Sequence, residues 1–243
     1  MCFHYSMSQV AQNLENRYNA PFTKGSNFQP VHHVSGFSFP LMPVVTNAPE
    51  PEIRLYHWGL VPSWTQNEEQ ASQMRAMTLN ARSETVFEKP SFRKSILSRR
   101  CLVPADGFFE WQAVENKRIP WYIRTKEQVI FSFGGIWDHW NNGKGESIYT
   151  FSILTTDANP MMAEIHNTKR RMPLILPASS ETKWLDPSVS GDDILKLMIP
   201  YPEEKLESWT ISRLITTRGA NTNTPEVKKP FSWDKPATSS GLF

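Results

Sequence analysis

The sequence predicts an α+β fold, a single domain in which a mainly antiparallel β-sheet carries flanking helices. Three observations lead to this prediction. A series of short, aromatic-rich segments is typical of strands, because aromatic and β-branched residues suit the pleated, half-buried surface of a sheet. Turn signals such as Asn141-Asn142-Gly143 separate these segments, which favours hairpin connections. Segments with helical spacing of apolar residues lie before and after the series.

Composition and charge narrow the class of protein. The 243 residues, 28.0 kDa in mass, suffice to bury a core without disulfides, and Cys2 and Cys101 form no pattern typical of a disulfide framework or a metal site. We therefore expect no metal and no cofactor. The chain shows neither a signal-peptide pattern nor an apolar run of membrane-spanning length, so we expect a cytoplasmic protein without a membrane partner. A net charge of +2 neither requires nor excludes a polyanionic partner.

The predicted elements begin with a strand at residues 2–5. Ser6 and Gln9 then match the Ser-x-x-Gln capping box, which predicts that a helix starts here. Leu14 and Tyr18 follow at helical spacing.

Residues 19–52 are rich in proline and predict loops with a short strand near residues 43–45. The adjacent His32 and His33 would point to opposite faces of an extended chain, which favours solvated or singly hydrogen-bonded rings over shared metal ligation. A strand is predicted at residues 53–60.

Two tryptophans, Trp58 and Trp64, bracket the turn after that strand. Such rings either stack nucleobases or fill the core. Residues 67–77 predict a helix, and residues 80–85 precede a further helical stretch that reaches Arg100. The amide, guanidinium and carboxylate within residues 80–85 either cap a helix and form salt bridges or position a nucleophile beside a phosphate-binding arginine.

The aromatic-rich strands are predicted at residues 101–104, 107–111, 121–123, 129–133 and 148–154. Glu110 is the unusual residue among them, because Phe109 and Trp111 flank it. Its carboxylate lies either on the solvated face of an edge strand or in an apolar site, where desolvation would raise its pKa and make it a general acid.

A short helix with Pro160 in its first turn is predicted to end at His166, which precedes the basic triplet at residues 169–171. A lone histidine is usually structural, but one so close to three cations indicates a phosphate-facing site. The predictions continue with a strand at residues 172–176, helices at residues 179–186 and 191–199, and a strand at residues 209–212. The domain is predicted to span residues 1–224, with a flexible tail at residues 225–243.

Cys2 directly follows the initiator methionine, and a small second residue allows removal of that methionine. The mature chain would then start with an α-amine of pKa about 8 beside a thiol of pKa about 8.5. The amine condenses with an aldehyde to an imine, and the thiol closes on the imine to give a thiazolidine. Alternatively, Cys2 is a hydrolytic nucleophile activated by its own amine, or a cysteine without a special role.

Four stretches together resemble the SRAP family, named for SOS response-associated peptidase and described as abasic-site-processing proteins. They are Met1-Cys2; Trp58-Gly59-Leu60-Val61-Pro62-Ser63-Trp64 leading to Asn80-Ala81-Arg82-Ser83-Glu84-Thr85; Asp106-Gly107-Phe108-Phe109-Glu110-Trp111; and His166 with Arg171-Met172-Pro173. The stretches occur in the family's order over about residues 1–176. The sequence departs from the usual family start, because Phe3 and His4 replace a glycine and an arginine, which puts a DNA contact from position 4 in doubt.

The resemblance implies a barrel-like sheet and a substrate with an aldehyde, the ring-opened abasic site of single-stranded DNA. It implies that Cys2 forms a covalent thiazolidine crosslink, that Asn80 orients Cys2 and the sugar, and that Glu110 transfers protons. His166 would act near the phosphate 3′ to the lesion. An imine intermediate would also permit β-elimination, a lyase side activity.

For DNA binding, the resemblance implies backbone contacts from Arg82 and Arg171, with Trp64 and Trp111 as stacking or wedge residues. It also implies a role in DNA repair and the SOS response, in a bacterial protein that associates with the nucleoid when it binds DNA. We expect a monomer.

Two alternative functions use the same residues. Cys2, Asn80, Glu110 and His166 match the set expected of an N-terminal-nucleophile peptidase that releases its own methionine. A third possibility is a non-catalytic module for damaged or modified DNA.

Separately, the terminal Leu242-Phe243 resembles peptides that dock on the replication sliding clamp, although the glutamine expected before them is missing.

Overall fold

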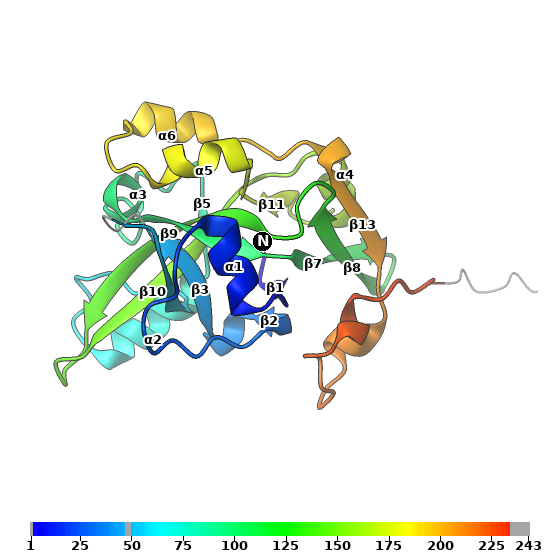
Figure 1. Cartoon of the computed structure of the whole chain (residues 1–243). Coiled ribbons are helices and arrows are strands. Elements are labelled where there is room, and N and C mark those ends of the chain that lie inside the picture. Colours follow the sequence, from blue (N-terminus) through cyan, green and yellow to red (C-terminus); the bar gives the residue numbers. More distant parts are fainter. Residues whose placement is uncertain (1, 47–49, 234–243) are drawn as a thin grey trace, which may run out of the picture.

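The computed structural model describes residues 2–46 and 50–233 (Figure 1). Within these residues the chain forms thirteen β-strands, six α-helices and four 3-10 helices. The strands are β1 (His4–Met7), β2 (Val31–Ser35), β3 (Leu41–Thr46), β4 (Glu52–Trp58), β5 (Asn80–Arg82), β6 (Arg100–Ala105), β7 (Gly107–Val114), β8 (Lys117–Thr125), β9 (Phe131–Asn141), β10 (Ser147–Asp157), β11 (Arg171–Pro173), β12 (Ile175–Leu176) and β13 (Leu206–Thr210). The helices are α1 (Ala11–Tyr18), α2 (Glu68–Met77), α3 (Ser95–Ser98), α4 (Pro160–Ile165), α5 (Ala178–Leu185) and α6 (Gly191–Leu197), with the 3-10 helices η1 (Gly36–Ser38), η2 (Glu203–Lys205), η3 (Arg213–Thr216) and η4 (Pro225–Lys228).

Five strands close into a barrel. Strands β10, β4, β3, β6 and β9 pair in that order, and β9 pairs again with β10 to complete the ring. All of these pairings are antiparallel except the one between β10 and β4. The α+β class and the barrel-like, mainly antiparallel sheet predicted from the sequence are therefore confirmed.

A second sheet has the strand order β13-β8-β7-β1-β2 and is antiparallel throughout. Its central strand, β7, carries the segment that includes Glu110. Gly107 begins β7 where the ring of Tyr122 on β8 crosses the backbone, and a Cβ added at Gly107 would lie 2.1 Å from the Tyr122 hydroxyl. Glycine at this position therefore allows the close approach of β7 and β8.

The start of the chain differs from the predicted capping box. Ser6 lies in β1, and α1 begins later, after Val10, without a side-chain cap. The Ser6 hydroxyl donates instead to Asp106, which is a hundred residues away in the sequence. A local pattern cannot show this competing acceptor. Burial of Leu14 and the ion pair of Arg17 with Glu181 attach the helix to the rest of the domain.

The helical stretch predicted up to Arg100 is also wrong in extent. Only α3 is an α-helix there, and Arg100 is a fully buried residue of β6. Its guanidinium donates to the main-chain carbonyls of Trp184 and Ile96, at 2.6 and 2.7 Å. Trp184 is 84 residues away in the sequence, so a local pattern cannot show this acceptor.

The first part of the predicted tail is packed against the domain. Val227 of η4 is fully buried, and residues Ile211 and Pro230 form a β-bridge. This segment, orange to red in Figure 1, lies on the side of the molecule that carries β8. Leu242 and Phe243 lie outside the described residues. Among the helices of the described residues, none is long and apolar enough to cross a membrane.

Candidate active site

A cavity of about 480 Å³ opens where β1 and β7 lie beside the segment after α4. It combines a carboxyl group and imidazoles with cationic side chains and aromatic rings. The lining residues are Phe3, His4, Glu110, Trp111, Arg118, His166, Thr168 and Lys169.

The sheet places the start of the chain next to Glu110. Strand β1 runs antiparallel to β7, with Tyr5 opposite Phe108 and Ser6 opposite Gly107. Residues before Tyr5 therefore extend along the part of β7 that follows Phe108. The main-chain carbonyl of Phe3 accepts a hydrogen bond from the Gly36 amide at 2.8 Å, which fixes the chain start to β2 and η1.

Cys2 is completely buried beside this cavity and does not line it. Its Sγ lies 3.6 Å from the main-chain oxygen of His4. Burial raises the pKa of the Cys2 thiol, and the nearby Glu110 carboxylate raises it further. The thiol is therefore neutral at physiological pH, and it lies within electrostatic range of a carboxyl group.

Glu110 is only 4% exposed. Burial raises the pKa of its carboxyl group to about 7. Both protonation states are then populated near neutral pH, which is the property that a group needs to donate and accept protons in turn. Of the two interpretations of Glu110, the structure supports the apolar site.

His166 is held at the end of α4, which has Asn159 as its N-cap and, as predicted, Pro160 in its first turn. Its Nδ1 donates to the main-chain carbonyl of Arg171 at 2.8 Å, because a carbonyl can only accept. Burial lowers the pKa of His166 to about 4, and the charges of Lys169 and Arg118 contribute. The ring is therefore neutral at pH 7, with Nε2 as its acceptor nitrogen.

The segment that carries His166 is attached to β7. The side chain of Asn167 accepts from the Ala113 amide at 3.0 Å and donates to the Ala113 carbonyl at 2.8 Å. Gln112 donates to the carbonyl of Glu164 at 3.2 Å. These bonds bring His166 and Glu110 to one cavity although they are far apart in the sequence.

Asn80 lies on β5, where it pairs with Ile153 of β10. It is 9% exposed, and neither its side-chain oxygen nor its nitrogen has a hydrogen-bond partner among the described residues. Leaving both groups of a buried amide unpaired costs free energy. Asn80 does not line the cavity described above.

The residues predicted to bind DNA differ in whether they line the cavity. Trp111 lines the cavity, and its ring meets the His4 ring edge-on at 4.8 Å between centroids. Arg82 and Trp64 are exposed and do not line it.

Arg171 is buried and already paired within the protein. Its guanidinium forms ion pairs with Glu84 and with Asp157, the latter at 2.9 Å, and it donates to the Thr155 carbonyl at 2.7 Å. The pair with Glu84 joins the segment after β5 to β11. Of the two interpretations of residues 80–85, this contact matches the salt bridge. The Glu84 carboxylate pairs with Arg171 rather than with Arg82.

Sequence reasoning missed several residues of the cavity. Lys169 belongs to the basic triplet, which was the one available signal for a cation here. Arg118 lies near the start of β8, opposite Ala113 of β7, where charged residues are ordinary, and nothing in the sequence marked it as a cavity residue. His4 lines the cavity although it replaces the family arginine. Among the described residues no group of His, Cys, Asp and Glu side chains could hold a metal ion.

Comparison with known proteins identifies the family of these motifs. The family model described as SOS response associated peptidase (SRAP) matches residues 1–218. The chain is 33% identical over 230 residues to the abasic site processing protein YoqW of Bacillus subtilis, covering 93% of this chain and 98% of that one. It is 35% identical over 202 residues to the abasic site processing protein HMCES of Rattus norvegicus, of which the match covers 55%.

Solved structures agree with this likeness. A crystal structure of a protein from Bacteroides thetaiotaomicron superposes with a TM-score of 0.89 and 40% identity, over 95% of this chain and all of that one. A protein from Bordetella bronchiseptica, 24% identical with a TM-score of 0.75, shares the fold.

Proposed function

The chain belongs to the SRAP family, and on that premise we propose that it processes abasic sites in single-stranded DNA through a covalent crosslink to Cys2. The observation that carries the proposal is that Cys2, the second residue of the chain, lies within electrostatic range of Glu110, whose pKa is about 7, beside a cavity with cationic residues. The names of the relatives YoqW and HMCES support abasic-site processing.

The crosslink forms in two stages, a condensation and a ring-closing addition, once Met1 has been removed. The α-amine of Cys2 adds to the aldehyde carbon of the ring-opened sugar and gives a carbinolamine. The carbinolamine loses its hydroxyl group as water and becomes an imine. The thiol sulfur then adds to the imine carbon, its proton passes to the nitrogen, and a thiazolidine results.

Glu110 serves this sequence as the proton carrier. As a carboxylate it accepts the thiol proton during ring closure, and in its protonated form it passes that proton to the nitrogen of the new ring. A pKa near 7 suits both transfers at neutral pH. The raised pKa of the Cys2 thiol also fits this order, because the sulfur stays protonated while the amine reacts and loses its proton to Glu110 only at ring closure.

Asn80 and His166 have supporting roles in the proposal. The unpaired amide of Asn80 would orient the sugar and Cys2 without changing its own charge. The neutral imidazole of His166 would accept a proton near the 3′ phosphate or assist reversal of the crosslink. An imine that loses a proton from the adjacent sugar carbon would undergo β-elimination, which is the lyase side activity.

Cationic side chains supply the DNA contacts. Arg118 and Lys169 line the cavity and would contact phosphates close to the lesion. Arg82 is exposed and would contact the backbone farther away, with Trp64 as a stacking residue and Trp111 as the ring inside the cavity. A phosphate at Arg171 would have to replace Glu84 or Asp157 as its partner.

The experiment is a denaturing gel of the purified protein incubated with a single-stranded oligonucleotide that carries one abasic site. We expect a shifted band without added reductant, its loss in Cys2→Ala, and its retention in Cys101→Ala. Cys101 is the matched control, because it is also a buried, free cysteine with a raised pKa. A band that persists in Cys2→Ala would contradict the proposal.

A peptidase that uses Cys2 as nucleophile is the second candidate, favoured by the description of the family model. It would need the thiolate at the moment of attack. Burial and Glu110 both raise the pKa of the Cys2 thiol, which opposes that state. Cleavage of a peptide substrate by the wild type, lost in Cys2→Ala, would favour this candidate over the crosslink.

A further inference from the structure

Three side chains from distant parts of the sequence form one hydrogen-bonded chain that ends at the cavity. The Thr222 hydroxyl lies 2.8 Å from Nδ1 of His33, and Nε2 of His33 lies 2.9 Å from Nδ1 of His4. The two imidazole rings lie in nearly parallel planes, with 10° between their planes and 5.2 Å between their centroids. His4 lines the cavity, and Thr222 is only half-buried.

The hydrogen-bond roles along this chain can run in two directions. In one direction Thr222 donates to His33, His33 donates to His4, and His4 carries its proton on Nε2. In the other, His4 donates to His33, His33 donates to Thr222, and Nε2 of His4 is an acceptor. Each ring keeps one proton in both arrangements, so they interconvert without charging either ring.

Protonation of the His4 or His33 imidazole to its cationic form is unfavourable here. Burial lowers the pKa of His33 to about 4, and burial together with the positive charge of His33 lowers the pKa of His4 to about 4. The Arg118 and Lys169 side chains of the same cavity add positive charge, whereas Glu110 adds negative charge when it is ionised. Both rings are therefore neutral at pH 7.

We propose that His4 is a catalytic residue that exchanges a proton with the sugar through Nε2, and that His33 and Thr222 are positioning residues that pass the proton between His4 and solvent. This inference rests on the proposed function. It assigns a role to Phe3-His4, the segment in which the sequence departs from the family start, and to Thr222, which lies beyond the matched residues 1–218.

The balanced step is loss of water from the carbinolamine. The Nε2 proton of His4 goes to the leaving hydroxyl group, the carbon–oxygen bond breaks, and the nitrogen lone pair forms the protonated imine. At the same time His4 Nδ1 takes the proton of His33 Nε2, His33 Nδ1 takes the proton of Thr222, and Thr222 takes one proton from a solvent acid. One proton enters from solvent and one water leaves.

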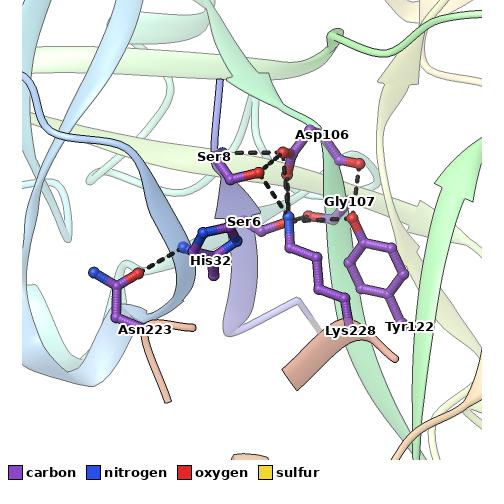
Figure 2. A network of polar contacts seen from close by, with 8 residues as sticks. All are labelled: Ser6, Ser8, His32, Asp106, Gly107, Tyr122, Asn223 and Lys228. Carbon is purple, nitrogen blue, oxygen red and sulfur yellow. Dashed lines mark hydrogen bonds and ion pairs between the residues drawn. The ribbon is translucent and has the colours of Figure 1, made fainter. Parts of the chain in front are cut away.

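The position of Thr222 next to Asn223 offers a matched control. Asn223 also ties this segment to β2, because its side-chain oxygen accepts from the His32 main-chain amide at 2.7 Å (Figure 2). Asn223→Ala removes that attachment but leaves the hydroxyl at Thr222 in place. Thr222→Val keeps the shape of the side chain and removes the hydroxyl.

The test measures the single-turnover rate of adduct formation with an oligonucleotide carrying one abasic site, in mixtures of H₂O and D₂O. We expect Thr222→Val to slow the reaction about tenfold, the equivalent of one hydrogen bond. We expect His4→Phe to slow it about 100-fold, as for loss of a general acid. In a plot of rate against deuterium fraction, the wild type should give a curve, because several protons move in one step. His4→Phe should give a straight line, because its proton relay is lost.

Wild-type rates in Thr222→Val and His4→Phe, with a Cys2-dependent adduct still formed, would overturn this inference and leave the proposed function intact. Equal slowing in Asn223→Ala and Thr222→Val would also overturn it, because the role of Thr222 would then be attachment of the segment. Absence of any adduct with the wild-type protein would overturn both.

Discussion

Asp106 and Glu110 are two buried carboxyl groups from one short segment, and their surroundings differ sharply. Asp106 accepts from the hydroxyl groups of Ser6 and Ser8 and forms an ion pair with Lys228 at 3.0 Å, as Figure 2 shows. Burial alone would raise the pKa of Asp106, but Lys228 and the two hydroxyl groups hold it below its ordinary value. At Glu110 burial is the larger effect: it outweighs the interactions that lower the pKa, among them a main-chain hydrogen bond at Trp111, and raises the pKa to about 7.

The difference shows how one segment supplies both a scaffold and a reactive group. A paired, ionised carboxylate fixes its surroundings, and Asp106 thereby attaches β1, through Ser6 and Ser8, and η4, through Lys228. A desolvated carboxyl group with a pKa near 7 is suited to proton transfer. Because β1 also delivers Cys2, the scaffold contact at Asp106 helps to place the residue on which Glu110 acts.

The largest expected effect comes from Glu110→Gln, which keeps the shape of the side chain and removes the titrating group. We expect the rate of adduct formation to fall about 100-fold or more, as for loss of a general acid and base. Single-turnover gel assays at pH 7 measure this rate. A rate within a factor of three of the wild type would remove Glu110 from the chemistry and with it the contrast to Asp106.

Asp106→Asn should act on stability instead. It leaves the buried ammonium of Lys228 without its counter-charge, and breaking a buried ion pair in this way costs about 3–5 kcal/mol. Urea unfolding followed by tryptophan fluorescence measures the loss.

Two further variants make the stability measurement specific. Lys228→Met is the matched partner change, and the double variant should recover part of the loss because neither charge is then left alone. Equal stability of Asp106→Asn and the wild type would show that the network in Figure 2 contributes no net stability.

Asn80→Ala should have a smaller effect, and mainly on rate. The side-chain amide has no partner among the described residues, so its removal should change the unfolding free energy by less than about 1 kcal/mol. The adduct should form about tenfold more slowly, the equivalent of one lost hydrogen bond to the sugar. A large loss of stability with an unchanged rate would assign Asn80 to the scaffold.

The two carboxyl groups should make stability change with pH in opposite directions. The raised pKa of Glu110 favours the folded state below its ordinary pKa of 4.5, and this contribution is lost as the pH rises to about 7. Asp106 has the opposite sign, because its contribution is present above its ordinary pKa of 3.8 and is lost as the pH falls through its lowered pKa. Urea unfolding of Glu110→Gln and Asp106→Asn between pH 3 and 8 should remove the first and the second dependence, respectively. An unchanged profile in either variant would contradict its assignment.

Much of the fold was predictable because it follows from local patterns. The many aromatic residues of β7 to β10 and the proline in the first turn of α4 can be recognised without the rest of the chain. What failed depends on partners far away in the sequence. The hydroxyl of Ser6 belongs to Asp106 rather than to a helix cap, and Lys228 fastens a segment whose composition predicts loose order.

In the candidate site, too, local sequence patterns were predictable and contacts between distant residues were not. Glu110 was recognisable from its apolar neighbours, but only the pairing of β1 with β7 places it beside the chain start. The contact between His4 and His33 joins residues 29 positions apart, and adjacent histidines in a proline-rich stretch gave no sign of it. Arg118 was missed because nothing in a hairpin sequence distinguishes a cation that faces a cavity.

The central claim is that Cys2 traps the abasic-site aldehyde with both its amine and its thiol. Its most direct test is the intact mass of the adduct formed by the wild-type protein without reductant, followed by peptide mapping. We predict the mass of the Met1-free protein plus the oligonucleotide less one water, with the modification on Cys2 and no free thiol at that residue. An adduct that retains Met1, or that maps to another residue, would contradict the account.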